Sequence, residues 1–146
     1  RYFTPGVHGF LQSLDNVGDI DVLNLRSAID PDSRRVLFQG SDAVLANSGH
    51  EPFGLVGLEA MAAGGVACTG CSGEDYAVPG RNALVLETND PREFLGLFGE
   101  LRNHPEQERE LRCAGQVTAQ QYHWPQIVQR ILLPRLRLLA ASESAE

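Results

Sequence analysis

The chain has 146 residues, of which 42% are hydrophobic and 21% are charged, and its formal net charge is −7. This length is typical of one domain, and the apolar content is sufficient for a packed core rather than a disordered chain. The acidic balance argues against non-specific nucleic-acid binding, and no apolar run is long enough to cross a bilayer. We therefore expect no nucleic-acid partner and no transmembrane segment.

Apolar periodicity and helix-cap signals predict helices that alternate with short strands. In chain order we expect a helix starting at Thr4-Pro5, a strand at 20–25, a helix at 31–40, a strand at 43–46, a helix at 53–63, strands at 66–69 and 83–86, and helices at 91–103, 105–122 and from Pro125 onward. Asp90 and Glu93 resemble a capping box, and Pro134 should kink or interrupt the last helix. Strands separated by helices predict an α/β fold, a Rossmann-like parallel sheet with helices on both faces.

Two glutamates mark the predicted strand–loop–helix unit at 43–63. Glu51 precedes the helix at the carboxyl end of a strand, the edge where open α/β sheets bind ligands. Glu59 lies a turn and a half along the helix, whose start attracts anions and whose Gly54 allows close approach of a ligand. Carboxylates on either side of an anion site suit the sugar hydroxyls, diphosphate and ribose of a nucleotide sugar. We expect both glutamates to face one cleft.

This stretch resembles the donor-binding motif E-x-F-G-L-x-x-L-E-A-M-A-x-G of family 4 retaining glycosyltransferases of the GT-B fold. The matching residues are Ser48, Glu51, Phe53, Gly54, Leu55, Leu58, Glu59, Ala60, Met61, Ala62, Gly64, Val66 and Ala67. The likeness continues at Gly73, Val78, Gly80, Asn82 and Val85, while Tyr76 and Ala83 stand where that family usually has glutamate and glycine. It covers roughly residues 19–139 and is specific between residues 48 and 85.

The resemblance implies that residues 1–146 form a single, partial C-terminal domain that binds a nucleotide-sugar donor. It implies sugar transfer to an acceptor hydroxyl with retention, without cofactor or metal, by a chain that is inactive alone. Glu51 would contact the donor sugar as the catalytic residue, and Glu59 would contact the ribose. Backbone amides at Phe53, Gly54 and Leu55 would bind sugar and phosphate. His50 could also contact the donor, or it could be a loop histidine without a role.

One expected part of the donor site is missing from the sequence. The family neutralises the donor diphosphate with an arginine–lysine pair on earlier strands, whereas this chain has no lysine. Arg1, Arg26 and Arg81 could approach a phosphate, although an exposed arginine is usually a solvated charge. We expect the chain to need an N-terminal domain or another chain as partner, and its unpaired sheet edge could favour a homo-oligomer.

Cys68, Cys71 and Cys113 include one C-x-x-C pair, which lies at a strand end rather than at the helix start that redox pairs prefer. The simpler interpretation is that all three are small buried thiols in a reducing, cytoplasmic protein. Two alternative functions also fit the sequence. One is a non-catalytic module of the same fold for assembly or ligand sensing, and the other is a sugar-nucleotide epimerase.

Overall fold

The computed structural model describes residue 25 and residues 28–48 and 50–143. The chain divides into two compact units, residues 1–30 and 31–146. The helix predicted at Thr4-Pro5 lies outside the described residues, as does the strand predicted at 20–25 apart from its last residue. The description below concerns the second unit.

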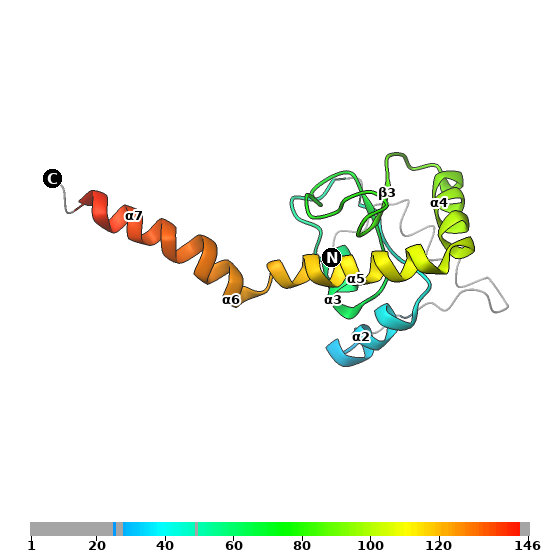
Figure 1. Ribbon diagram of the computed structural model, residues 1–146, viewed down its shortest axis with the longest axis horizontal. Helices are drawn as coiled ribbons and strands as arrows, with labels where there is room; N and C mark the ends of the chain where they lie inside the picture. Colours follow the sequence, from blue (N-terminus) through cyan, green and yellow to red (C-terminus); the bar gives the residue numbers. More distant parts are fainter. Residues whose placement is uncertain (1–24, 26–27, 49, 144–146) are drawn as a thin grey trace. The chain divides into compact units, whose positions relative to one another are not determined.

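A parallel sheet forms the centre of this unit. Strands β1 (Val44–Ala46), β2 (Ala67–Gly70) and β3 (Leu84–Leu86) pair in the order β1-β2-β3, with Leu45 opposite Cys68 and Cys68 opposite Leu84 (Figure 1). Every residue of β2 is buried, as expected for a central strand that is covered on both faces. The predicted α/β class and all three strand positions after residue 30 are confirmed, with bounds shifted by one residue.

Helices cover the two faces of the sheet and create two separate core clusters. Ala67 of β2 packs with Ala60 and Met61, whereas the neighbouring Cys68 packs with Leu101 and Leu111. Adjacent strand residues point to opposite faces, so each cluster belongs to one face. The helices that supply these clusters are α3 (Leu55–Ala63), α4 (Pro91–Asn103) and α5 (Pro105–Gln121).

Helix bounds follow local capping chemistry. Helix α3 begins at Leu55, two residues after the predicted start, because Gly54 has extended backbone angles, and it ends at Gly64 with a left-handed φ of 79°. The Asp90 carboxylate caps α4 by accepting a bond from the Arg92 amide. In a capping box, the Glu93 side chain would also accept a bond from the Asp90 amide. That part of the prediction is wrong, because the Glu93 carboxylate accepts bonds from the amides of Glu87 and Thr88 instead.

A helical run over residues 124–143 contains Pro134, which modifies the helix without terminating it. Helix α6 (Trp124–Ile127) passes into a π-helical turn, η1 (Val128–Leu132), and then into α7 (Leu133–Glu143). The proline ring conflicts with the carbonyl four residues earlier, at Arg130, and wider π-type bonding relieves that conflict. The helical run is continuous, so the predicted interruption is wrong and the helix instead changes type just before the proline. Leucines 136, 138 and 139 of α7 are exposed, and no helix among the described residues is long and apolar enough to cross a membrane.

Arg112 links three helices through backbone carbonyls. From α5, its guanidinium donates to the carbonyl of Gly64 at the end of α3 and to that of Ser41, just after α2 (Pro31–Gly40), at 3.0 and 3.1 Å. Its Nε also donates to Glu108 at 2.9 Å. The final carbonyls of a helix lack intrahelical partners, so a charged donor that satisfies two helix ends stabilises the packing of α2 and α3 on α5.

We expect Arg112→Ala to lower the free energy of unfolding by about 1.5–3 kcal/mol, because charge-assisted bonds to half-buried carbonyls are lost. The matched control is Arg109→Ala on the same helix, where the arginine pairs only with exposed Glu106 and removal should change stability by less than about 0.5 kcal/mol. Urea unfolding measures both variants. Equal effects of the two substitutions would contradict the linking role of Arg112.

Candidate functional site

The structure confirms the predicted placement of the two motif glutamates along the chain. Strand β1 ends at Ala46, and the following loop carries Glu51 before α3 begins at Leu55. Glu51 therefore lies at the carboxyl end of a parallel strand, and Glu59 lies on the next helix. Topology alone directs this loop to the sheet edge where α/β folds bind ligands.

The loop after β2 holds the Glu51 loop in place. The Gly54 amide donates to the Gly73 carbonyl at 3.0 Å, and the Glu51 amide donates to Ser72 Oγ at 3.4 Å. Gly73 has a φ of 74°, and a Cβ at this position would collide with the Glu51 carbonyl. Only glycine satisfies both the left-handed backbone and the close approach.

Tyr76 anchors the start of α3 from the same loop. Its buried hydroxyl donates to the Gly54 carbonyl, and its ring packs edge-on against Phe53 and Tyr122, with centroids 5.7 and 5.9 Å away. Burial, and secondly the charge of Glu74, raises the pKa of the Tyr76 phenol, so the hydroxyl remains a donor. The residue that departs from the family motif therefore has a structural role at the motif.

The Glu51 loop borders a hollow of about 360 Å³. Its wall combines polar side chains with the exposed start of α3. The lining residues are Leu45, Ala46, Asn47, Ser48, Glu51, Phe53, Gly54, Leu55, Val56 and Glu74. Four of the predicted site residues thus meet here: Glu51, Phe53, Gly54 and Leu55. His50 is exposed and does not line the hollow.

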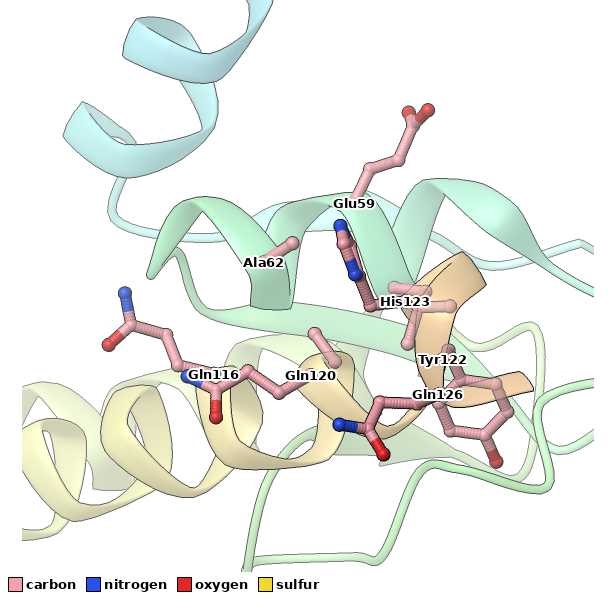
Figure 2. Close-up of a pocket in the computed structure, with 9 residues that line it drawn as sticks. Glu59, Ala62, Gln116, Gln120, Tyr122, His123 and Gln126 are labelled. Carbon is pink, nitrogen blue, oxygen red and sulfur yellow. The ribbon is translucent and has the colours of Figure 1, made fainter. Parts of the chain in front are cut away.

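Glu59 borders a different hollow, of about 590 Å³, between α3 and α5. Figure 2 shows its carboxylate extending away from the Gln116 and Gln120 side chains of α5, and it pairs with Arg34 of α2 at 3.2 Å. In the described part of the chain, the two glutamates therefore line separate hollows rather than the single predicted cleft. The spacing in the sequence gives the separation of the two glutamates along the chain, but it does not predict the helix packing that places them in different hollows.

Sequence reasoning did not select Glu74, which the structure brings to the Glu51 hollow. Glu74 is only 6% exposed, and both of its carboxylate oxygens are buried. Burial raises the pKa of this carboxyl and the charge of Glu51 raises it further, while the nearby Gly70 amide and Thr69 hydroxyl act in the opposite direction. The available signal was its position directly after the motif residue Gly73.

The other candidate groups lie away from the Glu51 hollow. Arg81 borders a separate hollow beside Tyr76 and Asn82, and Arg1 and Arg26 lie outside the described residues. Cys68 is buried, which raises its pKa to about 11, but the expectation of three buried thiols is wrong because Cys71 and Cys113 are exposed. Within the described ranges, no group of three or more histidine, cysteine or acidic side chains could hold a metal ion.

With this geometry in view, comparison with known proteins identifies the family. Residues 20–117 match the model of the glycosyl transferases group 1 family. The chain belongs to this family. It is 29% identical over 104 residues to D-inositol 3-phosphate glycosyltransferase of Corynebacterium urealyticum and 26% identical over 110 residues to that of Streptomyces scabiei. These matches cover 70% and 74% of this chain but only 24% and 25% of the relatives, so the chain spans about a quarter of their length.

Solved structures show the same GT-B architecture. Sucrose-phosphate synthase from Thermosynechococcus elongatus matches with a TM-score of 0.75 and 25% identity, over 92% of this chain and 34% of that chain. The C-terminal domain of the group 1 family protein LpcC from Francisella tularensis gives 0.68 at 19% identity, over 80% of this chain and 64% of that one. Anabaena HepE, in complex with UDP and glucose, gives 0.61 at 19% identity, over 97% and 36%.

Two glycines with left-handed backbones provide a matched test of the loop contact. Gly73→Ala and Gly80→Ala both place a side chain at positive φ, but only the Cβ at position 73 meets another group, the Glu51 backbone. We expect Gly80→Ala to cost about 1–2 kcal/mol of folding free energy and Gly73→Ala to cost more. NMR spectra of the Gly73→Ala protein should also show shifted amides at residues 50–56. If the two substitutions cost the same folding free energy and the amides at residues 50–56 do not shift, Gly73 is not in tight contact with the Glu51 backbone.

Stability should depend on pH through Glu74. Its folded pKa is raised above the ordinary value of 4.5, so the folded state binds the proton more tightly and loses stability as pH rises from that value through the folded pKa. Glu74→Gln removes this loss, so it should gain stability over the native chain at about pH 8 and little at about pH 4, with each unit of pKa shift worth about 1.4 kcal/mol. Urea unfolding across this range measures the difference. A difference in unfolding free energy between the two proteins that stays the same across this pH range would contradict a raised pKa of Glu74.

Proposed function

We propose that this chain binds the donor of a glycosyltransferase that moves a sugar from a nucleotide sugar to an acceptor hydroxyl with retention. The observation that carries the proposal is the hollow at the carboxyl end of β1. There, the Glu51 loop lies beside the start of α3, which no side chain caps. An uncapped helix start offers amides to phosphate, and a carboxylate beside it accepts hydroxyl donors of a sugar.

The proposed assignments follow the two hollows. The sugar would occupy the Glu51 hollow, with the diphosphate at the amides of the first turn of α3 after Gly54, because the Gly54 amide already bonds the Gly73 carbonyl. The ribose would meet the Glu59 carboxylate at the border of the second hollow, on the side where it pairs with Arg34. The complex of HepE with UDP and glucose supports this ligand class, since that protein shares the fold over nearly all of this chain.

The donor diphosphate requires positive charge that this chain does not provide at the Glu51 hollow. Among the described residues, no arginine, lysine or histidine lines it. We therefore propose that the acceptor-binding half lies outside these 146 residues or on another chain, and that the cation that stabilises the departing diphosphate comes from there or from residues outside the described ranges. The exposed leucines of α7 offer apolar surface for such a partner or for a second copy. The chain alone would be inactive.

In this proposal, catalysis is electrostatic. Glu51 orients the donor sugar, the bond between its anomeric carbon and the diphosphate breaks, and the acceptor oxygen forms a new bond to that carbon. The stabilised diphosphate leaves with the electron pair of the broken bond and takes up the proton of the acceptor hydroxyl. The proposed reaction uses neither a metal nor an organic cofactor. We propose that the reaction takes place in the cytoplasm, because its reducing conditions are compatible with three free cysteines. Transfer by the completed enzyme should then be unaffected by a chelator.

A non-catalytic, ligand-sensing module is the second candidate. It is favoured because no cationic side chain of the described residues lines the Glu51 hollow, since sensing a donor requires binding but no stabilisation of a leaving group. Sugar transfer at full activity after addition of the acceptor-binding half would exclude the non-catalytic function. Binding without transfer under those conditions would favour it over the enzyme.

Binding can be tested on this chain by NMR titration with UDP, GDP and UDP-glucose. Without its cationic partners, the diphosphate should bind weakly, with a Kd of roughly 1 mM. Glu59→Ala should weaken all three ligands because ribose is common to them, whereas Glu51→Ala should weaken only UDP-glucose. Charge-assisted bonds of about 1.5–3 kcal/mol predict losses of tenfold or more.

Arg34→Ala is the matched control for Glu59→Ala, because each breaks the ion pair between α2 and α3. Only Glu59→Ala also removes the proposed ribose acceptor, so Arg34→Ala should leave nucleotide affinity unchanged or increase it. Shift changes should cluster at residues 50–60. Perturbations elsewhere, or equal losses in the two variants, would reject the donor-binding assignment.

A further inference from the structure

Another hollow at the carboxyl edge of the sheet, the Cys71 hollow, receives no part of the donor in the proposed function. Its volume is about 130 Å³, which is room for several hydroxyl-sized groups, since about 10–15 Å³ of such space holds one water molecule. Residues that follow all three strands form its wall. They include Asn47 and Ser48 after β1, Cys71 and Ser72 after β2, and Thr88 and Asn89 after β3.

The Cys71 hollow adjoins the Glu51 hollow. Asn47 and Ser48 line both of them. Ser72 of the Cys71 hollow accepts a bond from the Glu51 amide through its Oγ, at 3.4 Å. A molecule in the Cys71 hollow therefore lies next to a sugar that contacts Glu51. This is where an acceptor is needed, because transfer requires the acceptor oxygen to be held close to the anomeric carbon of that sugar.

The loop after β3, which forms one side of the Cys71 hollow, is fixed in place by Glu93. This carboxylate, from the first turn of α4, accepts bonds from the Thr88 hydroxyl at 2.6 Å and from the Glu87 and Thr88 amides at 2.8 and 2.9 Å. The same bonds, that of the Thr88 hydroxyl first, lower the pKa of Glu93, so the carboxylate keeps its charge at neutral pH. A wall that is ordered before binding loses less conformational entropy when a ligand enters.

The chemistry of this wall suits neutral hydroxyl groups. The amides of Asn47 and Asn89 and the hydroxyl of Ser72 can each donate and accept hydrogen bonds, as sugar hydroxyls do. Glu87 also lines the hollow, whereas no arginine, lysine or histidine does so among the described residues. A phosphorylated or carboxylated molecule would meet a like charge there without a counter-charge, and a neutral polyol would not.

We propose that the Cys71 hollow is a subsite for the acceptor and that it takes the hydroxyl groups of a neutral, polyhydroxylated molecule. This inference rests on the proposed function. Asn47, Ser72 and Asn89 bind acceptor hydroxyls that do not react, and they thereby bring the reacting hydroxyl to the donor sugar beside Glu51. The acceptor-binding half supplies the remaining contacts.

Alkylation of cysteines by iodoacetamide, followed by mass spectrometry of the digested chain, tests the occupancy of this hollow. Cys71 lines it and is exposed, whereas Cys113 of α5 is exposed outside it and is the internal control. UDP-glucose is present throughout, to fill the Glu51 hollow. With a Kd of roughly 50 mM, sorbitol at about 100 mM should slow alkylation of Cys71 about threefold and leave that of Cys113 unchanged. Gluconate, of similar size but charged, should protect Cys71 less.

Asn89→Ala should remove most of the protection of Cys71 by sorbitol, because it removes a polar group from the wall. The matched control is Asn103→Ala at the end of α4, since the exposed Asn103 does not line the hollow. It should keep the protection. Equal slowing at Cys71 and Cys113, equal protection by sorbitol and gluconate, or equal protection of the native chain and Asn89→Ala would overturn the acceptor subsite.

A separate NMR titration with UDP-glucose distinguishes failure of this subsite from failure of the proposed function. If UDP-glucose shifts the amides at residues 50–60 while sorbitol leaves Cys71 unprotected, the Cys71 hollow is not an acceptor subsite and the proposed function stands. If UDP-glucose does not bind, the proposed function fails, and the acceptor role of the hollow fails with it.

Discussion

The site depends on one backbone contact, in which the loop after β1 meets the loop after β2 at Gly54 and Gly73. The amide of one glycine bonds the carbonyl of the other, and Gly73 lies against the Glu51 backbone. Parallel strands bring both loops to the same edge, but only residues without side chains permit this approach. The contact fixes where Glu51 lies relative to α3 and brings Glu74 over the start of that helix.

Two electrostatic effects oppose each other at the carboxyl edge of the sheet. The first amides of α3 favour an anion, whereas Glu51 and Glu74 make the adjoining hollow acidic. A ligand with an anionic part and a neutral, hydroxyl-rich part satisfies both tendencies at once.

The aromatic packing at the site shows how a departure from a motif is accommodated. Tyr76 replaces an acidic residue of the family pattern, and its hydroxyl bonds the Gly54 carbonyl while its ring contacts Phe53 and Tyr122. The three rings connect both loops to the end of α5. An acidic group is still present nearby, because Glu74, two residues earlier, occupies the buried position beside Gly54. The loop therefore combines an aromatic anchor with a carboxyl group.

The sequence by itself determined the local features: the three strands after residue 30, the helices at 31–121, the cap at Asp90, and the position of Glu51 between strand and helix. These follow from periodicity and from backbone preferences that act within a few residues. Only the tertiary structure decided which residues from distant segments of the chain come into contact. The packing of α3 against α5 left the two glutamates in different hollows, and the approach of Gly73 buried Glu74 beside Gly54. Contacts between distant segments depend on how helices and loops pack in space, and no local pattern encodes that packing.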